Sequence, residues 1–269
     1  FYLLFLLILG LPIMTMEFAV GRASQKSPVK AYYALEKPGQ KWHIHGYITL
    51  IGCYLLMMFY TTVAGWMLHY FYLTATGKFT GLDSDAVASQ FNPRLSQPQV
   101  MGFWMVIIVI AGILVCSIGL QNGLEKVTKV MMISLLFIMV ILAINSFFMD
   151  GAKEGLSFYL IPDFERMKEI GIIKTITGAM NQAFFTLSLG IGAMSIFGSY
   201  IGKERSLLGE SLNIALLDTF VAITSGLIIF PACFTFHVDQ TSGPGLIFIT
   251  LPNIFNHIPM GKLWGSLFF

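Results

Sequence analysis

The residues best suited to bind a ligand lie within residues 175–200, a stretch long enough to cross a bilayer. At its centre, residues 186–192 read Thr-Leu-Ser-Leu-Gly-Ile-Gly, so hydroxyls and two glycines stand where a continuous helix gains nothing from them. We therefore predict a broken helix whose freed amide and carbonyl groups act as ligands. Irregular backbone is tolerated at membrane depth only where it is buried in protein or lines a cavity, so the break should border a binding site. The alternative is a continuous helix with small residues for close packing.

A carboxylate is the second group that could do chemistry. Of the 14 acidic residues, only Asp218 is expected deep inside an apolar stretch, residues 207–236. The helical rise of 1.5 Å per residue places it roughly 10 to 20 Å along that helix. Charged side chains at such depth are costly and usually functional, so Asp218 is a candidate cation ligand. The alternative is a buried acid that only accepts hydrogen bonds from neighbouring hydroxyls, with no ion.

Membrane-spanning helices must position these groups, because 56% of the residues are hydrophobic and only 11% are charged. Several apolar runs approach or exceed the roughly 20 residues that a span requires. We predict an all-α, polytopic transmembrane bundle, with a polar segment at residues 237–258 that folds back on the outer surface. The predicted apolar segments are residues 1–16, 47–72, 100–120, 130–149, 175–200 and 207–236, with a further run beginning at 260.

The charges of the connecting loops predict the orientation of the bundle. The loop at residues 17–46 has five basic residues against Glu17 and Glu36, and an excess of basic residues in a short loop marks the cytoplasmic side. Lys203 and Arg205 form a second small basic turn on the same side. The basic residues of the first loop are Arg22, Lys26, Lys30, Lys37 and Lys41.

Composition and motifs argue against other classes of protein. A net charge of +2, without a basic run interleaved with aromatic residues, argues against a nucleic-acid partner. The sequence shows no metal-ligand spacing of histidines, no phosphate-binding glycine loop and no nucleophile beside a base, so we expect no enzyme activity. Cys53, Cys116 and Cys233 all lie in apolar segments, where we interpret them as small core residues.

Three motifs resemble those of the neurotransmitter:sodium symporters, which have the LeuT-type inverted-repeat fold. Residues 186–190 resemble that family's unwound sixth helix, residues 123–126 with 129–132 resemble its entry to the fifth helix, and residues 243–252 resemble its external hairpin. The stretch from Pro12 to Arg22 also resembles the end of the second helix. The resemblance covers nearly the whole chain, and in this fold substrates bind near the membrane midplane at broken helices.

The resemblance assigns roles to individual residues of this sequence. It implies that Tyr60 contacts the substrate carboxylate, that Phe185 forms a lid over the substrate, and that Leu56, Ser188 and Ile191 line the pocket. Ile191 stands where relatives often have an aromatic residue, which leaves the substrate's identity open. Thr186 matches a sodium ligand, and Asp218 is expected to act with it. Tyr200 matches a tyrosine near the cytoplasmic gate.

The same comparison implies that the chain corresponds to helices two to early eight of the family fold. We expect residues 1–269 to be a single transmembrane transporter domain that is truncated at both ends, without the first helix and without everything after the start of the eighth. The oligomeric state and the number of sodium ions cannot be read from the sequence.

The resulting functional hypothesis is sodium-coupled symport of a neutral, hydrophobic amino acid by alternating access, in a multi-pass protein of the cell membrane in contact with lipid. Sodium is the coupling ion, and chloride is expected not to be required, because Asp218 would supply the negative charge that chloride provides in some relatives. The alternative is a transport-inactive membrane scaffold or sensor that retains the LeuT-type fold. The sequence of the missing first helix would discriminate between the two.

Overall fold

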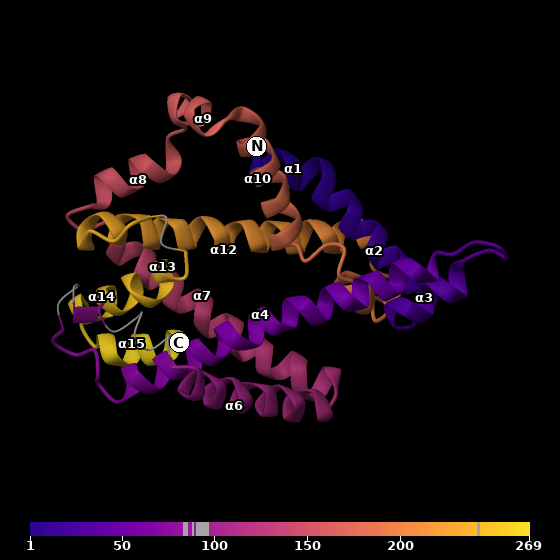
Figure 1. Ribbon diagram of the computed structural model, residues 1–269, viewed down its shortest axis with the longest axis horizontal. Helices are drawn as coiled ribbons and strands as arrows, with labels where there is room; N and C mark the ends of the chain where they lie inside the picture. The colour runs from indigo at the N-terminus through magenta and orange to yellow at the C-terminus, as the bar shows by residue number, and fades with distance from the viewer. Residues whose placement is uncertain (83–85, 88, 90–96, 241–242) are drawn as a thin grey trace. The chain divides into compact units, whose positions relative to one another are not determined.

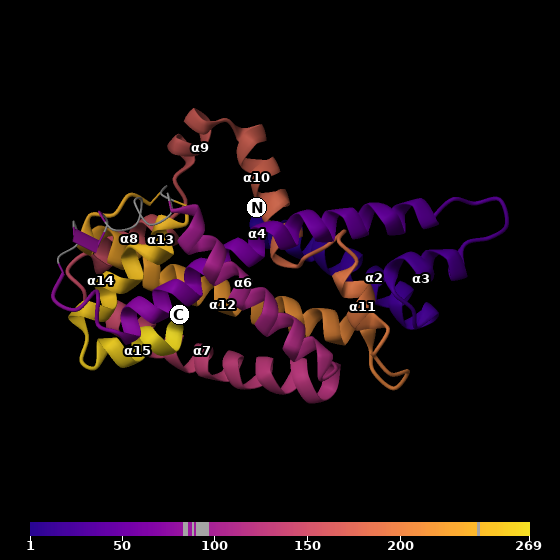
Figure 2. The same cartoon turned by 60° about the horizontal axis from the view of Figure 1, so that its bottom comes forward.

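The structure, a computed structural model, describes residues 1–82, 86–87, 89, 97–240 and 243–269 (Figures 1 and 2). These residues form helices and connecting segments, without a strand among them. Parts of the predicted loop before residue 98 lie outside the described residues. Five helices within the described part of the chain are long and apolar enough to cross a membrane: Tyr2–Ser24, His43–Ala75, Pro98–Ser117, Gly123–Ser146 and Leu207–Phe236.

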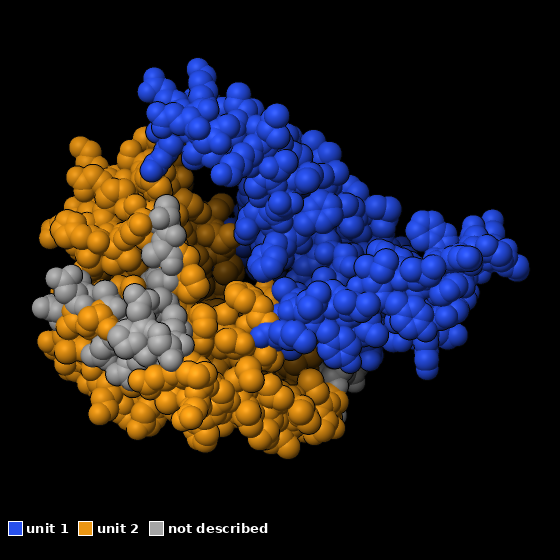
Figure 3. Space-filling model, in the orientation of Figure 1, with its two compact units in different colours: residues 1–58, 163–220 blue, residues 59–162, 221–269 orange. Residues whose placement is uncertain are grey.

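The chain folds into two compact units, which Figure 3 distinguishes by colour. Unit 1 consists of Phe1–Met58 and Asp163–Phe220, and unit 2 consists of Phe59–Pro162 and Val221–Phe269. The single transmembrane domain expected from the sequence stays a prediction.

Unit 1 is built around an N-terminal helical segment and a broken helix. The N-terminal segment consists of α1 (Tyr2–Phe5), a π-helical turn η1 (Leu6–Gly10) and α2 (Leu11–Ser24), and it is followed by α3 (Pro28–Leu35). The second half of the unit contains α9 (Phe164–Ile170), α10 (Ile172–Thr186) and α11 (Ala193–Gly198). The unit also includes the first part of α4 (His43–Ala75), up to Met58, and the first part of α12 (Leu207–Phe236), up to Phe220.

The first helix is longer than the sequence analysis predicted. We expected the span to stop at residue 16 and a cytoplasmic loop to begin at Glu17, but α2 continues to Ser24 and ends where Gln25 adopts a left-handed conformation with φ of 50°. The expectation was wrong because the charge of Glu17 does not end the helix, which has apolar residues on both sides of it. Phe18 is 1% exposed within this extension, so packing inside the unit holds the helix together beyond Glu17.

The core of unit 1 surrounds the end of α10. Met14 and Phe18 of α2 are buried together with Ala183 of α10 and Leu187 and Leu189 of the segment that follows. The break in the second half of the unit is thus packed against the helix that begins the chain.

Two glycines allow α2 and α11 to approach at the level of their backbones, and Figure 2 shows these helices side by side. A Cβ on Gly21 would meet the carbonyl oxygen of Ser195, and a Cβ on Gly198 would stand 2.5 Å from the carbonyl oxygen of Phe18. The contact is therefore reciprocal, with one glycine on each helix. Small residues at helix interfaces are the usual means of such close packing in membranes.

Unit 2 contains the remaining long helices and the C-terminal short ones. It comprises α6 (Pro98–Ser117), a π-helical turn η2 (Leu120–Glu125), α7 (Lys126–Ser146), α8 (Ala152–Leu160), α13 (Gly245–Phe248), α14 (Thr250–His257) and α15 (Gly261–Phe268), with the ends of α4 and α12. The residues between the predicted apolar segments 100–120 and 130–149 are helical, because Lys126 and Lys129 lie exposed on α7 and do not interrupt it.

The polar segment after α12 contains α13 and α14, and neither is among the helices long and apolar enough to cross a membrane. That this segment folds back on the outer surface stays a prediction. The first six residues of α14, Thr250 to Phe255, are all buried. They contribute Leu251, Ile254 and Phe255 to the core of unit 2, together with Leu142 of α7 and Ile228 of α12. The segment is polar and has two prolines, yet the apolar side chains of α14 belong to the core of unit 2.

The glycine contact between α2 and α11 predicts a specific loss of stability. Gly198→Ala should lower the free energy of unfolding by about 1–3 kcal/mol, because the added methyl group meets backbone that cannot move aside as a side chain can. Thermal unfolding of the purified full-length protein measures this. Gly178→Ala on α10 is the matched control, since a Cβ there meets no atom within 4 Å, and it should be neutral or stabilising by up to about 1 kcal/mol. Equal effects of the two substitutions would contradict the prediction.

Candidate functional site

The predicted break in residues 175–200 is confirmed. Helix α10 ends at Thr186, α11 begins at Ala193, and the six residues between them are not helical. Three of the six have left-handed backbone conformations: Ser188 with φ of 51°, Gly190 with φ of 83° and Gly192 with φ of 75°. The two glycines adopt this conformation without a steric cost, which explains their place in the sequence.

The last turn of α10 closes on itself through two backbone hydrogen bonds. The amide of Ser188 donates to the carbonyl of Phe185 at 3.1 Å, and the amide of Leu189 donates to the carbonyl of Phe184 at 3.1 Å. This is the Schellman arrangement that ends many helices, with a serine at the left-handed position that glycine usually occupies. A left-handed non-glycine residue costs of order 1–3 kcal/mol and persists only where its surroundings enforce it.

A carboxylate of α2 satisfies the next freed amide. Oε1 of Glu17 accepts a hydrogen bond of 2.7 Å from the amide of Gly190. Its other oxygen, Oε2, is buried and accepts no hydrogen bond from the described residues. Helix α3 lies outside the membrane-spanning helices, and burial there raises the pKa of the Tyr32 phenol above its ordinary value. The negative charge of the nearby Glu17 carboxylate raises this pKa further. Glu17 therefore joins the N-terminal helix to the centre of the break.

Asp218 lies on α12 and contacts Thr186, the last residue of α10. The hydroxyl of Thr186 donates to Oδ2 of Asp218 at 2.8 Å, and the hydroxyl of Tyr2 on α1 approaches the same oxygen at 3.5 Å. Oδ1 accepts no hydrogen bond from the described residues. The structure thus brings Thr186 and Asp218 together in a direct hydrogen bond. This bond is also what the alternative of an acid without an ion predicts, so the role of the two residues as sodium ligands stays a prediction.

Four of the five residues predicted to bind the substrate line one cavity in unit 1. Its volume is about 230 Å³, which is of the size of a small organic molecule. Of its lining, Asn181 and Ser188 are polar and the remainder is apolar. The residues that line it are Leu56, Asn181, Phe184, Phe185, Ser188, Leu189 and Ile191.

The remaining two predicted residues do not line this cavity. Tyr60 stands on α4 one helical turn after Leu56, at a position that belongs to unit 2, and it is 42% exposed. Its role in substrate binding stays a prediction. Tyr200 follows α11 and is 65% exposed, and its role at a cytoplasmic gate likewise stays a prediction.

The sequence analysis missed two residues of this site, Tyr2 and Glu17. The charge of Glu17 favours a loop, and Tyr2 is one aromatic residue within an apolar run. Their partners lie 173 and 216 residues away in the sequence, so no local pattern connects them. The one available signal was the apolar sequence on both sides of Glu17, which is typical of a charge inside a span.

Comparison with known proteins gives relatives along the whole chain. A model of the sodium:neurotransmitter symporter family matches residues 88–269. An uncharacterized sodium-dependent transporter of Bacillus subtilis, YhdH, is 34% identical over 264 residues, which are 98% of this chain and 57% of that protein. An uncharacterized sodium-dependent transporter of Haemophilus influenzae is 28% identical over 273 residues, which are 98% of this chain and 59% of that protein. The chain thus spans somewhat more than half the length of these curated relatives.

A solved structure has the same fold. The crystal structure of MhsT in complex with L-phenylalanine matches with a TM-score of 0.92 and 37% sequence identity, over 99% of this chain and 60% of that chain. This likeness confirms the predicted LeuT-type fold. The sodium-dependent transporters among the relatives confirm the expectation that the chain is not an enzyme.

The bond from Gly190 to Glu17 predicts how the break responds to loss of a charge. Glu17→Gln should weaken the bond by about 1–3 kcal/mol, because a charged acceptor is replaced by a neutral one. Hydrogen–deuterium exchange over residues 187–192 of the full-length protein should become faster. Glu154→Gln on α8, where the acid is exposed, is the control and should leave that exchange unchanged. Unaltered exchange in Glu17→Gln would show that the bond does not hold the break.

Proposed function

Since the chain belongs to the sodium:neurotransmitter symporter family, we propose that it takes part in sodium-coupled symport of a neutral, hydrophobic amino acid across the cell membrane. The observation that carries the proposal is the break at residues 187–192, which has a mostly apolar cavity and a hydroxyl–carboxylate pair around it. A continuous helix would offer neither free backbone groups nor the space for a ligand.

The cavity supports a substrate with an apolar side chain. Leu56, Phe185 and Ile191 surround it, and an uncompensated charge placed against these side chains would cost several kcal/mol. The L-phenylalanine bound to MhsT is an amino acid of this class, in a protein with the same fold. The amides of Ser188, Leu189 and Gly190 are already bonded within the protein. The Ser188 hydroxyl and the other backbone groups of the break can pair with the polar part of such a substrate.

Sodium is transported with the substrate, and Thr186 and Asp218 are the residues we assign to it. Both present oxygen atoms, which hard cations prefer, and the carboxylate supplies a full negative charge. Coupling requires only that sodium binds the substrate-binding conformation more tightly than the other conformations. Sodium then raises substrate affinity, and the substrate raises sodium affinity by the same factor.

Asp218 also underlies the proposal that transport does not require chloride. An ionised carboxylate beside sodium provides the negative charge that a bound anion would otherwise supply. Ala222, four residues later in the sequence, has no hydroxyl to offer an anion. The proposal thus assigns the balancing charge to the protein itself.

The first test is sodium-driven uptake of a panel of amino acids by the full-length protein in proteoliposomes. We expect aliphatic or aromatic amino acids to be taken up in preference to aspartate or lysine, because charged side chains find no partner in the cavity. Uptake with potassium in place of sodium is the control. Preferential uptake of a charged amino acid, or uptake that does not depend on sodium, would contradict the proposed function.

The second test concerns Tyr60. If its hydroxyl donates to the substrate carboxylate, Tyr60→Phe should weaken substrate binding by about 1–3 kcal/mol, the cost of leaving a charged acceptor without its donor. Tyr54→Phe, a change to another exposed tyrosine of α4, is the matched control. Scintillation proximity binding to full-length protein measures both. Unchanged affinity in Tyr60→Phe would remove this residue from the site.

The third test replaces chloride with gluconate during sodium-driven uptake. Wild-type uptake should persist, whereas Asp218→Asn should lose most of its activity in gluconate, since the carboxamide has no charge to balance sodium. Wild-type uptake that collapses without chloride would refute chloride independence. An Asp218→Asn variant with full activity in gluconate would refute the role of the carboxylate.

A further inference from the structure

The connection between α3 and α4 is closed by a contact between its two ends. Glu36 directly follows α3, and His43 is the first residue of α4. Nδ1 of His43 lies 2.9 Å from Oε1 and 3.0 Å from Oε2 of Glu36, and the amide of His43 donates to Oε2 at 3.0 Å. The proposed symport makes no use of this pair. The charge pattern of the sequence predicts that residues 36–43 lie on the cytoplasmic side.

The contact changes its character when the histidine takes up a proton. Both carboxylate oxygens accept, so Nδ1 donates and carries a hydrogen in the neutral ring as well as in the charged ring. Burial disfavours the charge of Glu36, but the hydrogen bonds from the amide and the ring of His43 outweigh it and hold the pKa of this carboxyl below its ordinary value. A histidine side chain binds its second proton near a pH of about 6.5. Below that pH a neutral hydrogen bond becomes an ion pair.

Among the described residues, the other groups that face the imidazole keep their charge in this pH range. Tyr33 of α3 stacks on the imidazole with ring centroids 4.5 Å apart and 8° between the planes, and Tyr47 of α4 stands edge-on to Tyr33 at 6.4 Å. Phenols lose their proton only near a pH of about 10, and the face of the Tyr33 ring attracts a cation. Lys37 and Lys41 of the connection form no ion pair within the described part of the chain. Glu36 is therefore the charged group that responds to protonation of the imidazole.

Helix α3 lies between α4 and the end of the break. A Cβ on Gly192, the last residue of the break, would stand 2.9 Å from Cγ of Pro28, the first residue of α3. Oγ1 of Thr49 on α4 is 3.5 Å from the same point. A Cβ on Gly46 of α4 would stand 2.8 Å from Cα of Val29. Because the three segments are in direct contact, a change in how α3 sits on α4 is transmitted to Gly192.

We propose that Glu36 and His43 form a pH-sensitive clamp, which holds α3 against the end of the break and becomes tighter when His43 is protonated. The added strength is present below the histidine titration and is lost as the pH rises through it. At the acidic end the clamp fails only when Glu36 itself takes up a proton. A tighter clamp restrains the backbone torsions of residues 187–192. The consequence for transport rests on the proposed function: acid on the cytoplasmic side should slow sodium-driven uptake.

Hydrogen–deuterium exchange of residues 187–192 in the full-length protein tests the clamp at pH values of about 6 and about 8, on either side of the histidine titration. The measured quantity is the exchange rate of a variant divided by that of wild type at the same pH, so the intrinsic effect of pH on exchange cancels. His43→Asn keeps a donor near the position of Nδ1 but cannot take a charge. Its rate ratio should rise about two- to fivefold from the alkaline to the acidic pH, the effect of a partly exposed ion pair. A ratio that is equal at both pH values would overturn the proposal.

Two further variants separate this pair from its surroundings. Glu36→Gln keeps an acceptor oxygen and removes the charge, so its rate ratio should rise in the same way. His45→Asn is the matched control, because His45 stands edge-on to Tyr32 of α3 at 5.0 Å and forms no ion pair with the residues that the structure describes. Its ratio should be the same at both pH values. A rise in His45→Asn without one in His43→Asn would assign the pH response to His45 and refute the clamp.

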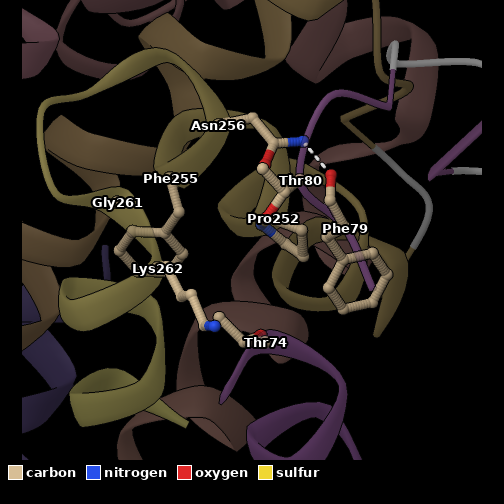
Figure 4. Close-up of a pocket in the computed structure, with 8 residues that line it drawn as sticks. All are labelled: Thr74, Phe79, Thr80, Pro252, Phe255, Asn256, Gly261 and Lys262. Atoms are coloured by element: carbon tan, nitrogen blue, oxygen red, sulfur yellow. Dashed lines mark hydrogen bonds between the residues drawn. The ribbon is translucent and has the colours of Figure 1, made fainter. Parts of the chain in front are cut away.

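The turn after α4, in unit 2, is an internal control in the same exchange measurement (Figure 4). The side-chain amide nitrogen of Asn256 donates to the carbonyl of Phe79 at 2.8 Å, the bond that Figure 4 marks, and to the carbonyl of Leu82 at 3.2 Å. Neither kind of group titrates, so the rate ratio of residues 77–82 in His43→Asn should be independent of pH. A rise there equal to that of residues 187–192 would show a general effect of acid on the variant, and no clamp at the break.

Sodium-driven uptake by the full-length protein in proteoliposomes tests the consequence for transport, with the pH on the cytoplasmic side set to about 6 or about 8 and the other side constant. Wild-type uptake should be about two- to fivefold slower at the acidic pH, and uptake by His43→Asn should be nearly equal at both. The same dependence on pH in the two proteins would refute regulation by the clamp. Uptake that does not depend on sodium at either pH would contradict the proposed symport and leave the exchange result intact, so the two failures are distinguishable.

Discussion

The backbone at the break between α10 and α11 must find its hydrogen-bond partners inside the protein, and much of unit 1 follows from that constraint. An unpaired amide or carbonyl in a hydrocarbon environment costs several kcal/mol. Two amides, those of Ser188 and Leu189, bond back to the last turn of α10, and the amide of Gly190 bonds to Glu17. The bond to Glu17 can form only if α2 passes beside the break.

The same break leaves room for a ligand and places a charge near it. Phe185 and Ser188 line the cavity, while Thr186, between them, directs its hydroxyl to Asp218. Adjacent residues at the end of α10 therefore face two different places, the cavity and Asp218. This proximity gives a physical route for coupling, because anything that alters the end of α10 at Thr186 also alters the cavity wall.

Local patterns in the sequence were sufficient to predict some features and not others. The glycines and hydroxyls of residues 186–192 identified the break, since their effect on the backbone is local. The bounds of α12 agree with the predicted span at 207–236, because polar residues stand at both ends of the apolar run. Glu17 could not be placed, because what stabilises a charge inside a helix is a partner 173 residues away. The burial of α14 could not be predicted for the same reason, since it depends on α7 and α12.

The glycine contact between α2 and α11 restricts how unit 1 can change shape. With backbone against backbone at Gly21 and Gly198, neither helix can slide or rotate past the other without a steric clash. The second half of the broken helix and α2 should therefore move as one rigid body. Any rotation of α11 relative to α10 then has to be absorbed by the backbone torsions of residues 187–192, which would make this segment a hinge as well as part of a binding site.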